Sequence, residues 1–456
     1  MAVDAEQPVV AFDRTAFESF RFLGRELGAD GRVRLDYALD QEFHFSEQIE
    51  LPVPQPLSCA ECARVDGLLA LLHWVAGISY FKAALPPRIS CESGAPSPAA
   101  AALLEALYSE GLGELAYTNR LESLPRPVFP RTAASPPGVP APERLERLLV
   151  PVGGGKDSAV AIEIARRSGA EVSLFSIGDA PPIARTAAAA ELPHLIARRT
   201  IDPLLFELNA AGAVNGHIPI TAIVTCVALL TAALNGFDAV AMANERSASA
   251  GNLQWDGVDV NHQFSKGLVA ERLLSAAVAE TGVPVRQFSI LRGASELAIA
   301  RAFAGMERYH GAFTSCNAIF RIDPTLRAAS WCCDCPKCRF VFLALAPFSS
   351  PEHLHEIFGA DLLDDDAQFE GFALLAASGG HKPFECVGEE QESLAAMRML
   401  AEDPRWREHA VVRRLTDEVL ARSPDSAGAP REVLALGEDH DVPAQLLEDV
   451  RAILRP

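Results

Sequence analysis

Two alternating patterns of apolar and polar positions fill residues 145–345. Short, continuous apolar runs are typical of strands buried on both faces, and longer stretches with apolar positions three and four residues apart are typical of amphipathic helices. The short runs predict strands at residues 148–152, 171–177, 195–200, 239–243 and 285–290. The longer stretches predict helices at residues 159–167, 184–191, 220–234, 267–280 and 295–303. Because strands and helices alternate, we expect an α/β fold with a parallel sheet and helices on both faces.

The regions before and after this segment have weaker patterns. Residues 1–122 combine an alternating stretch with a long helical pattern at 65–84, which predicts an N-terminal α+β domain. Prolines crowd residues 123–144. Because proline restricts both its own backbone and the residue before it, we expect a linker there. Amphipathic stretches within residues 346–456 predict a mostly helical C-terminal region.

A glycine-rich turn joins the first predicted strand of the sheet to the first helix, with the sequence Gly153-Gly-Gly-Lys-Asp-Ser158. Glycines let the backbone approach a ligand closely, and the free N–H groups of a helix N-terminus attract an anion. The alternative is a glycine turn without a ligand, but Lys156 adds a cation and Ser158 a hydroxyl donor. We therefore expect Gly153, Gly154, Gly155, Lys156, Asp157 and Ser158 to bind phosphate, and Lys156, Asp157 and Ser158 also to assist catalysis.

The spacing of this turn differs from the two common nucleotide-binding patterns, G-x-x-x-x-G-K-[ST] and G-x-G-x-x-G. The order Gly-Gly-x-Asp-Ser resembles the PP-loop of the ATP pyrophosphatase superfamily. Members of that superfamily cleave ATP between the α- and β-phosphates and leave an adenylated intermediate. The resemblance implies that residues 145–345 form a PP-loop domain, of the adenine nucleotide alpha hydrolase-like type, and that ATP binds there.

Polar clusters follow other predicted strands, where ligands of a parallel sheet bind. The segment Ser176, Ile177 and Gly178 follows the second strand, and its backbone groups are suited to an adenine pocket. Asn244, Glu245 and Arg246 follow the fourth strand, and we expect them to contact ATP. Magnesium needs only one or two carboxylates beside phosphate oxygens, so Glu245 is the candidate Mg²⁺ ligand; the alternative is a simple pair with Arg246.

Further along the chain, His262 and Lys266 are candidates for neutralising phosphate or carboxylate charge, and for catalysis.

Cysteines suggest a second site. The chain contains 10 cysteines, and Cys332-x-x-Cys335-x-x-Cys338 has the spacing of ligands that enclose one metal ion. Tetrahedral zinc requires a fourth ligand, for which Cys316 is the first candidate and Cys333 the second. A four-cysteine zinc site would be closed and structural. An iron–sulfur cluster fits the same ligands, and a reduced cysteine-rich loop without metal is the remaining alternative.

Composition restricts the partners. The 456 residues carry a formal net charge of −20, which argues against a nucleic acid or an anionic membrane as partner. The N-terminus lacks the pattern of a signal peptide, and the most apolar stretch, at residues 218–234, is typical of a buried helix. We therefore expect a cytoplasmic protein.

Taken together, these clusters resemble the MurL family of ATP-dependent epimerases. The resemblance covers at least residues 148–348. It rests on segments that occur in order along the chain: Gly153-Gly-Gly-Lys-Asp-Ser158, Asn215-Gly-His-Ile-Pro219, Asn244-Glu-Arg-Ser-Ala248, Val260-Asn-His-Gln-Phe-Ser-Lys266, Ser315-Cys-Asn317 and Trp331-Cys-Cys-Asp-Cys-Pro-Lys-Cys-Arg-Phe340.

The resemblance implies an enzyme of peptidoglycan precursor synthesis, which serves cell wall formation. Such an enzyme inverts the terminal L-Glu of UDP-N-acetylmuramoyl-L-alanyl-L-glutamate to D-Glu. Adenylating the α-carboxylate removes its charge and acidifies the Cα–H, while Mg²⁺ and the PP-loop stabilise the leaving pyrophosphate. The candidates for proton transfer are Cys316, Cys333, His262 and Lys266.

Two other functions fit parts of the pattern. A tRNA-modifying PP-loop enzyme, of the thiolation or lysidine-synthetase type, uses the same adenylation chemistry, but the net charge argues against it. The other alternative is a non-catalytic nucleotide-binding or zinc-scaffold protein. Such a protein does not require the intact loop together with Glu245, so the presence of both argues against it. The sequence does not determine the oligomeric state.

Overall fold

The computed structural model describes residues 12–455, apart from 135–137, 139, 141, 321–324, 326, 379–381, 425 and 426. The N-terminal residues that were read for a signal peptide therefore lie outside the described residues, as do several positions of the predicted linker. The other positions of 123–144 contain neither a helix nor a strand.

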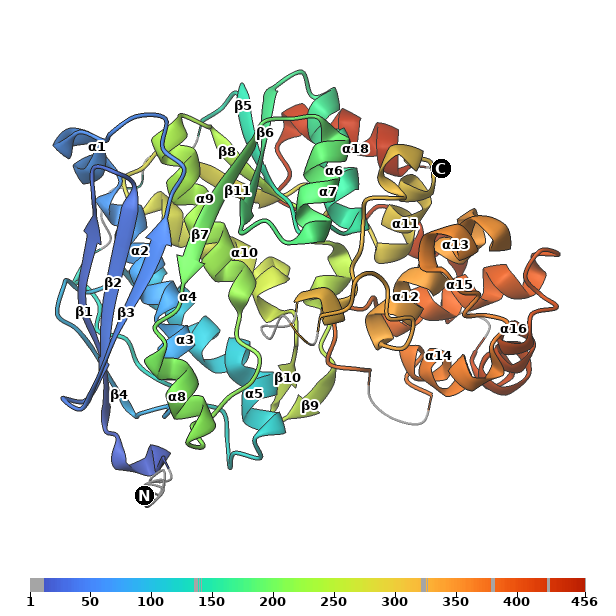
Figure 1. The fold of residues 1–456 in the computed structure, drawn as a ribbon, viewed down its shortest axis with the longest axis horizontal. Helices are drawn as coiled ribbons and strands as arrows, with labels where there is room; N and C mark the ends of the chain where they lie inside the picture. The colour runs from blue at the N-terminus through green and yellow to red at the C-terminus, as the bar shows by residue number, and fades with distance from the viewer. Residues whose placement is uncertain are drawn as a thin grey trace, which may run out of the picture.

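A nine-stranded sheet has the order β11-β8-β5-β6-β7-β3-β2-β1-β4 and extends from the upper centre of the molecule to its left edge, where β1 to β4 lie (Figure 1). Each strand predicted within residues 145–345 forms, and these strands pair in parallel. They are β5 (Arg147–Pro151), β6 (Glu171–Ile177), β7 (His194–Thr200), β8 (Ala239–Met242) and β11 (Arg286–Ser289). The fold is therefore α/β with a large, mostly parallel sheet.

The N-terminal strands continue this same sheet. They are β1 (Ser19–Leu27), β2 (Arg32–Leu39), β3 (Phe43–Glu50) and β4 (Arg88–Cys91). Strand β3 pairs antiparallel with β7, and a buried ion pair joins the two, because Arg199 Nε lies 2.8 Å from a carboxylate oxygen of Glu47. The sequence pattern did not predict β1, which is irregular because its register shifts between Phe22 and Gly24. Strand β2 was not predicted either, although its first residues alternate between exposed and buried.

Helices cover both faces of the parallel part of the sheet, whereas β1 to β3 at the left edge have helices on one face, and later helices gather at the other end of the molecule (Figure 1). The first half of the chain forms α1 (Cys59–Arg64), α2 (Asp66–Ala76), α3 (Ile78–Phe81), α4 (Pro98–Ser109), α5 (Gly113–Thr118), α6 (Lys156–Arg167), α7 (Pro181–Ala190) and α8 (Leu204–Ala210). The second half forms α9 (Ile220–Asn235), α10 (Leu268–Ala279), α11 (Glu296–Ala304), α12 (Pro336–Leu345), α13 (Pro351–Phe358), α14 (Phe369–Leu375), α15 (Glu390–Glu402), α16 (Ala410–Arg414), α17 (Pro430–Val433) and α18 (Leu447–Leu454). A short hairpin, β9 (Leu253–Trp255) and β10 (Val258–Val260), lies apart from the sheet.

The helix predicted at 65–84 is divided at Gly77, where α2 ends and α3 begins. A Cβ atom at this position would lie only 2.5 Å from the ring of Phe22 in β1. Glycine therefore allows close packing of the helix pair on the N-terminal strands.

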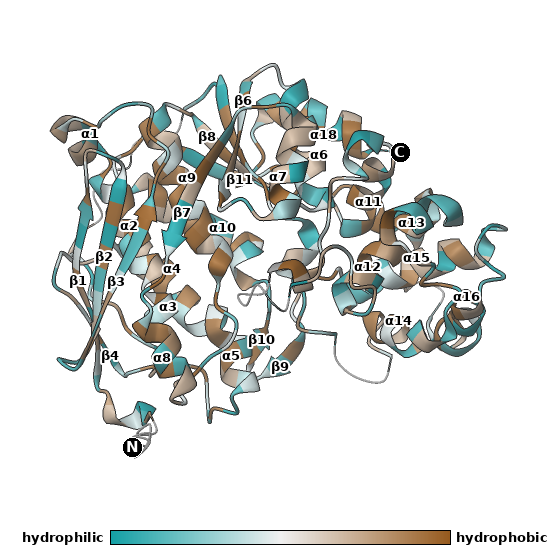
Figure 2. Cartoon of the chain, viewed as in Figure 1, coloured by the Kyte–Doolittle hydropathy of each residue, from teal (hydrophilic) through white to brown (hydrophobic). Residues whose placement is uncertain are grey.

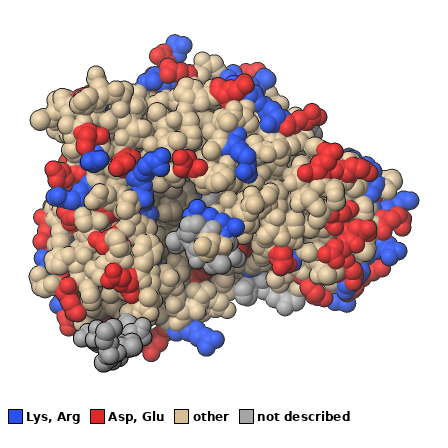
Figure 3. Space-filling model, in the orientation of Figure 1, with Lys and Arg blue, Asp and Glu red and all other residues tan. Residues whose placement is uncertain are grey.

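Burial on both faces explains the continuous apolar runs of the central strands. Along β5, Leu148 and Val150 belong to one core, with α6, α11 and α12, whereas Leu149 belongs to the other, with α2 and α9. Figure 2 shows the brown, apolar strands between these helix layers. No helix among the described residues is long and apolar enough to cross a membrane. On the face shown in Figure 3, basic side chains are interspersed with acidic ones and form no continuous basic patch.

Candidate active site

A cavity of about 360 Å³ lies at the carboxyl ends of β5, β6 and β8. Strand β5 lies between β6, the next strand along the chain, and β8, from a later part of the chain. The strand order therefore reverses at β5, and open α/β sheets bind ligands at such a switch point. The glycine-rich loop lines the cavity on one side, and segments from much later in the chain line the other. The cavity-lining residues include Gly153, Gly155, Asp157, Ser158, Ser176, Ile177, Asn244, Lys266, Ser315, Asn317, Lys337 and Cys386.

Backbone geometry explains the three glycines of the loop. Gly154 has φ +84°, and a Cβ atom there would lie 2.7 Å from the backbone of Pro182. A Cβ atom on Gly155 would lie 2.6 Å from the hydroxyl of Ser315. The amide of Gly153 donates a 2.9 Å hydrogen bond to Ser158 Oγ, which closes the loop over the start of α6. The first N–H groups of α6 therefore border the cavity.

Lys156 is buried behind the loop rather than within the cavity. Its ammonium group donates hydrogen bonds to the carboxylates of Asp157 and Glu296. Burial by itself lowers the pKa of Lys156, but attraction to Asp157 and Glu296 outweighs this effect and raises it. Lys156 therefore stays charged and holds two carboxylates at the edge of the cavity.

Three carboxylates from distant segments meet beside the loop. Ligand oxygens of Asp157, Glu245 and Glu296 lie within 4.8 Å of one another, close enough to hold one metal ion. Oxygen ligands of this kind suit Mg²⁺. Burial and repulsion from Glu296 raise the pKa of Glu245, although Lys266 and Lys337 oppose part of this effect. The sequence had singled out Glu245 but not Glu296, because an acidic residue in the first turn of a helix is common without a ligand.

A buried arginine supports this arrangement from behind. Arg292 forms an ion pair with Glu271 at 2.7 Å and donates hydrogen bonds to the carbonyl oxygens of Glu245 and Lys266, at 2.6 and 2.5 Å. It thereby couples the segment after β8 to the segment that carries Lys266. The sequence analysis did not identify Arg292, since its role depends on groups from three separate segments.

The residues predicted for the nucleotide lie in different environments. Ser176 and Ile177 line the cavity, whereas Gly178 lies just beyond, where it accepts a 2.6 Å hydrogen bond from Ser176 Oγ. The amide of Asn244 donates to Ser289 Oγ at 2.7 Å, which orients the segment after β8. Arg246 points elsewhere and donates to the carbonyl oxygens of Val433 and Ala435 near the C-terminus.

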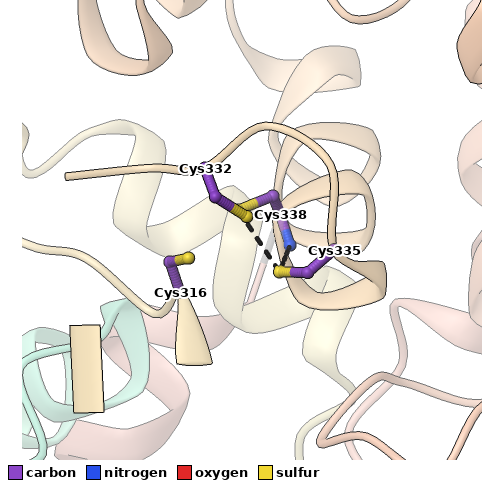
Figure 4. A group of neighbouring side chains, drawn as sticks. All are labelled: Cys316, Cys332, Cys335 and Cys338. Atoms are coloured by element: carbon purple, nitrogen blue, oxygen red, sulfur yellow. Dashed lines mark hydrogen bonds between the residues drawn. The ribbon is translucent and has the colours of Figure 1, made fainter. Parts of the chain in front are cut away.

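The three cysteines with metal-ligand spacing, Cys332, Cys335 and Cys338, form one group with Cys316, the first candidate for the fourth ligand (Figure 4). Their Sγ atoms lie within 4.8 Å of one another, with 3.7 Å between Cys332 and Cys338 and 3.5 Å between Cys335 and Cys338. Tetrahedral zinc, with Zn–S bonds of about 2.3 Å, would separate its sulfurs by about 3.8 Å, so the group fits a zinc ion. The fourth member is Cys316; the thiol of Cys333 instead donates to the carbonyl oxygen of Phe358 at 3.4 Å.

A second set of polar groups, which the sequence analysis only partly identified, lies at the far side of the cavity. Lys266 Nζ lies 3.4 Å from Cys386 Sγ, and His262 also hydrogen bonds Cys386. His262 Nδ1 contacts a carboxylate oxygen of Glu114 at 2.5 Å. Lys337 donates a hydrogen bond to the backbone carbonyl of Cys386. His262 and Lys266 had been predicted; Cys386 and Glu114 had not, because Cys386 stands in no recognisable motif.

Comparison with known proteins gives the family. The model of the MurL N-terminal domain matches residues 11–290, more than half of the chain, and that of the MurL C-terminal domain matches residues 312–429. A Micromonospora protein named UDP-N-acetyl-alpha-D-muramoyl-L-alanyl-L-glutamate epimerase is 49% identical over 430 residues, which are 91% of this chain and 93% of that protein.

Proteins of the same name show similar agreement in two other bacteria. The one from Salinispora tropica is 49% identical over 399 residues, which are 85% of this chain and 86% of that protein. The one from Xanthomonas oryzae pv. oryzae is 42% identical over 445 residues, which are 97% of this chain and 99% of that protein. The chain therefore belongs to the MurL family, and it is an enzyme of the epimerase class.

Proposed function

We propose that the enzyme inverts the terminal L-Glu of UDP-N-acetylmuramoyl-L-alanyl-L-glutamate to D-Glu in the cytoplasm, in peptidoglycan precursor synthesis, with ATP as co-substrate. The names of the relatives support the substrate. The observation that carries the use of ATP is a cavity lined by a glycine-rich helix N-terminus, Asp157 and two lysines, beside which the buried carboxylates of Glu245 and Glu296 group with Asp157. Such a set suits a triphosphate with its metal ion, whereas simple proton transfer does not require it.

The reaction follows from the charge at the substrate carboxylate. Removing the Cα proton next to an ionised carboxylate would place a second negative charge beside the first. If the α-carboxylate oxygen attacks the α-phosphorus of ATP, pyrophosphate leaves and a mixed anhydride remains, in which the former carboxylate no longer carries a charge and the phosphate keeps its own. The Cα proton then becomes more acidic, is removed, and is replaced on the opposite face. Water finally cleaves the anhydride, which yields AMP and the D-Glu product.

The residues of the cavity divide this work. The amides of Gly153, Gly154 and Gly155, with Ser158, would hold the phosphates; Ser176, Ile177 and Asn244 would contact the nucleoside. Asp157, Glu245 and Glu296 would hold Mg²⁺, which neutralises the charge of the leaving pyrophosphate. Lys156 keeps two of these carboxylates in place. The strand order β7-β6-β5-β8-β11, which matches that of doubly wound nucleotide-binding sheets, supports a PP-loop domain within residues 145–345.

We assign a structural zinc ion to the group of Cys316, Cys332, Cys335 and Cys338, which joins the segment before α12 to the loop at Ser315. Replacing Cys335 by Ser is expected to lower bound zinc from about one ion per chain to a small fraction and to reduce thermal stability, since metal binding contributes to folding. Metal analysis and calorimetry measure both effects.

The matched control for the zinc site is Cys333→Ser, which changes a neighbouring thiol that faces Phe358. This variant should retain its zinc. Loss of zinc in both variants would place Cys333 among the ligands. A visible absorption band in the wild-type protein that disappears in Cys335→Ser would show that the cysteines hold an iron–sulfur cluster and not zinc.

One incubation tests the proposed reaction directly. Purified enzyme with Mg-ATP and UDP-N-acetylmuramoyl-L-alanyl-L-glutamate should form AMP and pyrophosphate, and acid hydrolysis of the product should release D-Glu. Omitting ATP should abolish D-Glu formation. Formation of AMP without D-Glu would support an adenylating site but exclude the muramoyl dipeptide as the substrate that is epimerised. Stimulation of AMP release by tRNA would identify a nucleic-acid substrate instead. Bound ATP without either product would indicate a binding protein.

A further inference from the structure

The proton-transfer step requires a base within the same cavity as the adenylating groups. Of the four residues suggested by sequence, Cys316 lies in the cysteine group and Cys333 faces Phe358, so neither thiol points to the cavity. Cys386, in contrast, lines the cavity together with Gly155, Asp157 and Ser315. It belongs to the segment that precedes α15.

Charged groups surround this thiol. The ammonium of Lys266 lies 3.4 Å from Cys386 Sγ, and the ring of His262 hydrogen bonds it from another side. Behind His262, a carboxylate oxygen of Glu114 contacts Nδ1 at 2.5 Å and fixes the orientation of the ring. The order thiol, imidazole, carboxylate is that of activated nucleophiles and bases in many enzymes, where the carboxylate holds the imidazole in place.

We propose that Cys386, as a thiolate held by Lys266 and the His262–Glu114 pair, exchanges the Cα proton of the adenylated glutamate on one face. The inference rests on the proposed function and identifies the general base of its proton-transfer step. The thiolate sulfur takes the Cα proton and becomes a thiol, while the electrons of the C–H bond move onto the acyl oxygen as an enolate. A proton delivered to the opposite face from water in the cavity completes the inversion, and solvent then resets the thiol.

Electrostatics support this role. Burial alone would raise the pKa of Cys386, but Lys266 and a hydrogen bond from His262 lower it to about 6. Burial alone would lower the pKa of His262, but its contacts with Cys386 and Glu114 raise it to about 9. At neutral pH the pair is therefore thiolate and imidazolium, and the thiol formed on proton capture is a group whose pKa lies near the working pH, as efficient proton transfer requires.

The decisive variant is Cys386→Ala, assayed in D₂O with ATP and with each epimer of the dipeptide substrate separately. Adenylation, followed as pyrophosphate–ATP exchange, should stay within about threefold of wild type. Deuterium incorporation at Cα should fall by about 100-fold or more for at least one epimer, because general-base catalysis contributes about 10²–10⁴ in rate. Unchanged incorporation from both epimers would overturn the proposal.

Two further measurements separate a chemical role from a structural one. Cys62→Ala changes a thiol of α1 outside the cavity and should leave both activities unchanged. Wild-type enzyme that forms AMP but exchanges no Cα proton would refute the proposed function itself, whereas exchange by wild type and Cys386→Ala alike would refute only the role of Cys386.

The pH dependence of alkylation reports the thiolate directly. Iodoacetamide labelling of Cys386, quantified by mass spectrometry, should rise with pH around a midpoint near 6, instead of the value of about 8.5 for a free cysteine. The groups that face this thiol are Lys266, His262, Lys337 and Glu385. Lys266→Met should move the midpoint upward, towards that of a free thiol, and a midpoint that stays in place would contradict the role given to Lys266.

Discussion

Replacing Glu245 by Gln is expected to lower the rate of AMP formation by about 100- to 1,000-fold, the loss typical of removing one electrostatic stabiliser of a transition state. The substitution preserves the size of the side chain but removes a charged oxygen from the group formed with Asp157 and Glu296. The Mg²⁺ concentration for half-maximal activity should rise about 10- to 100-fold. Initial rates measured over a Mg²⁺ titration give both numbers.

Glu392→Gln is the matched control for this prediction. Glu392 is buried in the same region and accepts a 2.9 Å hydrogen bond from the amide of Glu296, but it is not one of the three clustered carboxylates. Burial and repulsion from Glu296 raise the pKa of Glu392 to about 8. Above that pH its replacement removes one negative charge without removing a candidate ligand, so the Mg²⁺ dependence measured there should change little. If both variants shift the Mg²⁺ dependence equally, general charge rather than ligation by Glu245 explains the effect.

Replacing Lys156 by Met is expected to destabilise the protein by about 3–5 kcal/mol, because it removes the cation that joins Asp157 to the buried carboxylate of Glu296. Lys337, at 3.7 Å, then compensates Glu296 only in part. If the chain unfolds as one unit, this destabilisation corresponds to a fall in Tm of about 3–5 °C, since the entropy of unfolding is about 2 cal/mol/K per residue. Calorimetry without ATP measures the change, and saturating Mg²⁺ should reverse part of it.

The double variant with Lys156→Met and Glu296→Gln tests the cause of this loss. If the penalty comes from an uncompensated carboxylate, removing the charge of Glu296 should recover part of the stability lost in Lys156→Met. A double variant that is less stable than Lys156→Met, by the full cost of the second substitution, would show that the two side chains act independently.

Local patterns were sufficient for the central strands and for the loop. In β5 and β6 every residue except the two at the strand ends is buried, so continuous apolar runs identified them without knowledge of their partners. The same reasoning failed for β1, whose burial is irregular, and it placed one helix where Gly77 divides two. Local patterns also did not reveal that β3 pairs with β7. This pairing joins the strands of residues 1–122 to the central sheet.

Sequence alone determined the features that neighbouring residues create. The turn at Gly153–Ser158 and the spacing of Cys332, Cys335 and Cys338 are local, because backbone sterics and one or two helical turns bring their atoms together. Only the tertiary structure decided the partners: 140 positions separate Lys156 from Glu296, 148 separate Glu114 from His262, and 120 separate Lys266 from Cys386. Such contacts depend on how distant segments pack around the sheet, and a buried charge reveals its role only when the group that compensates it is known.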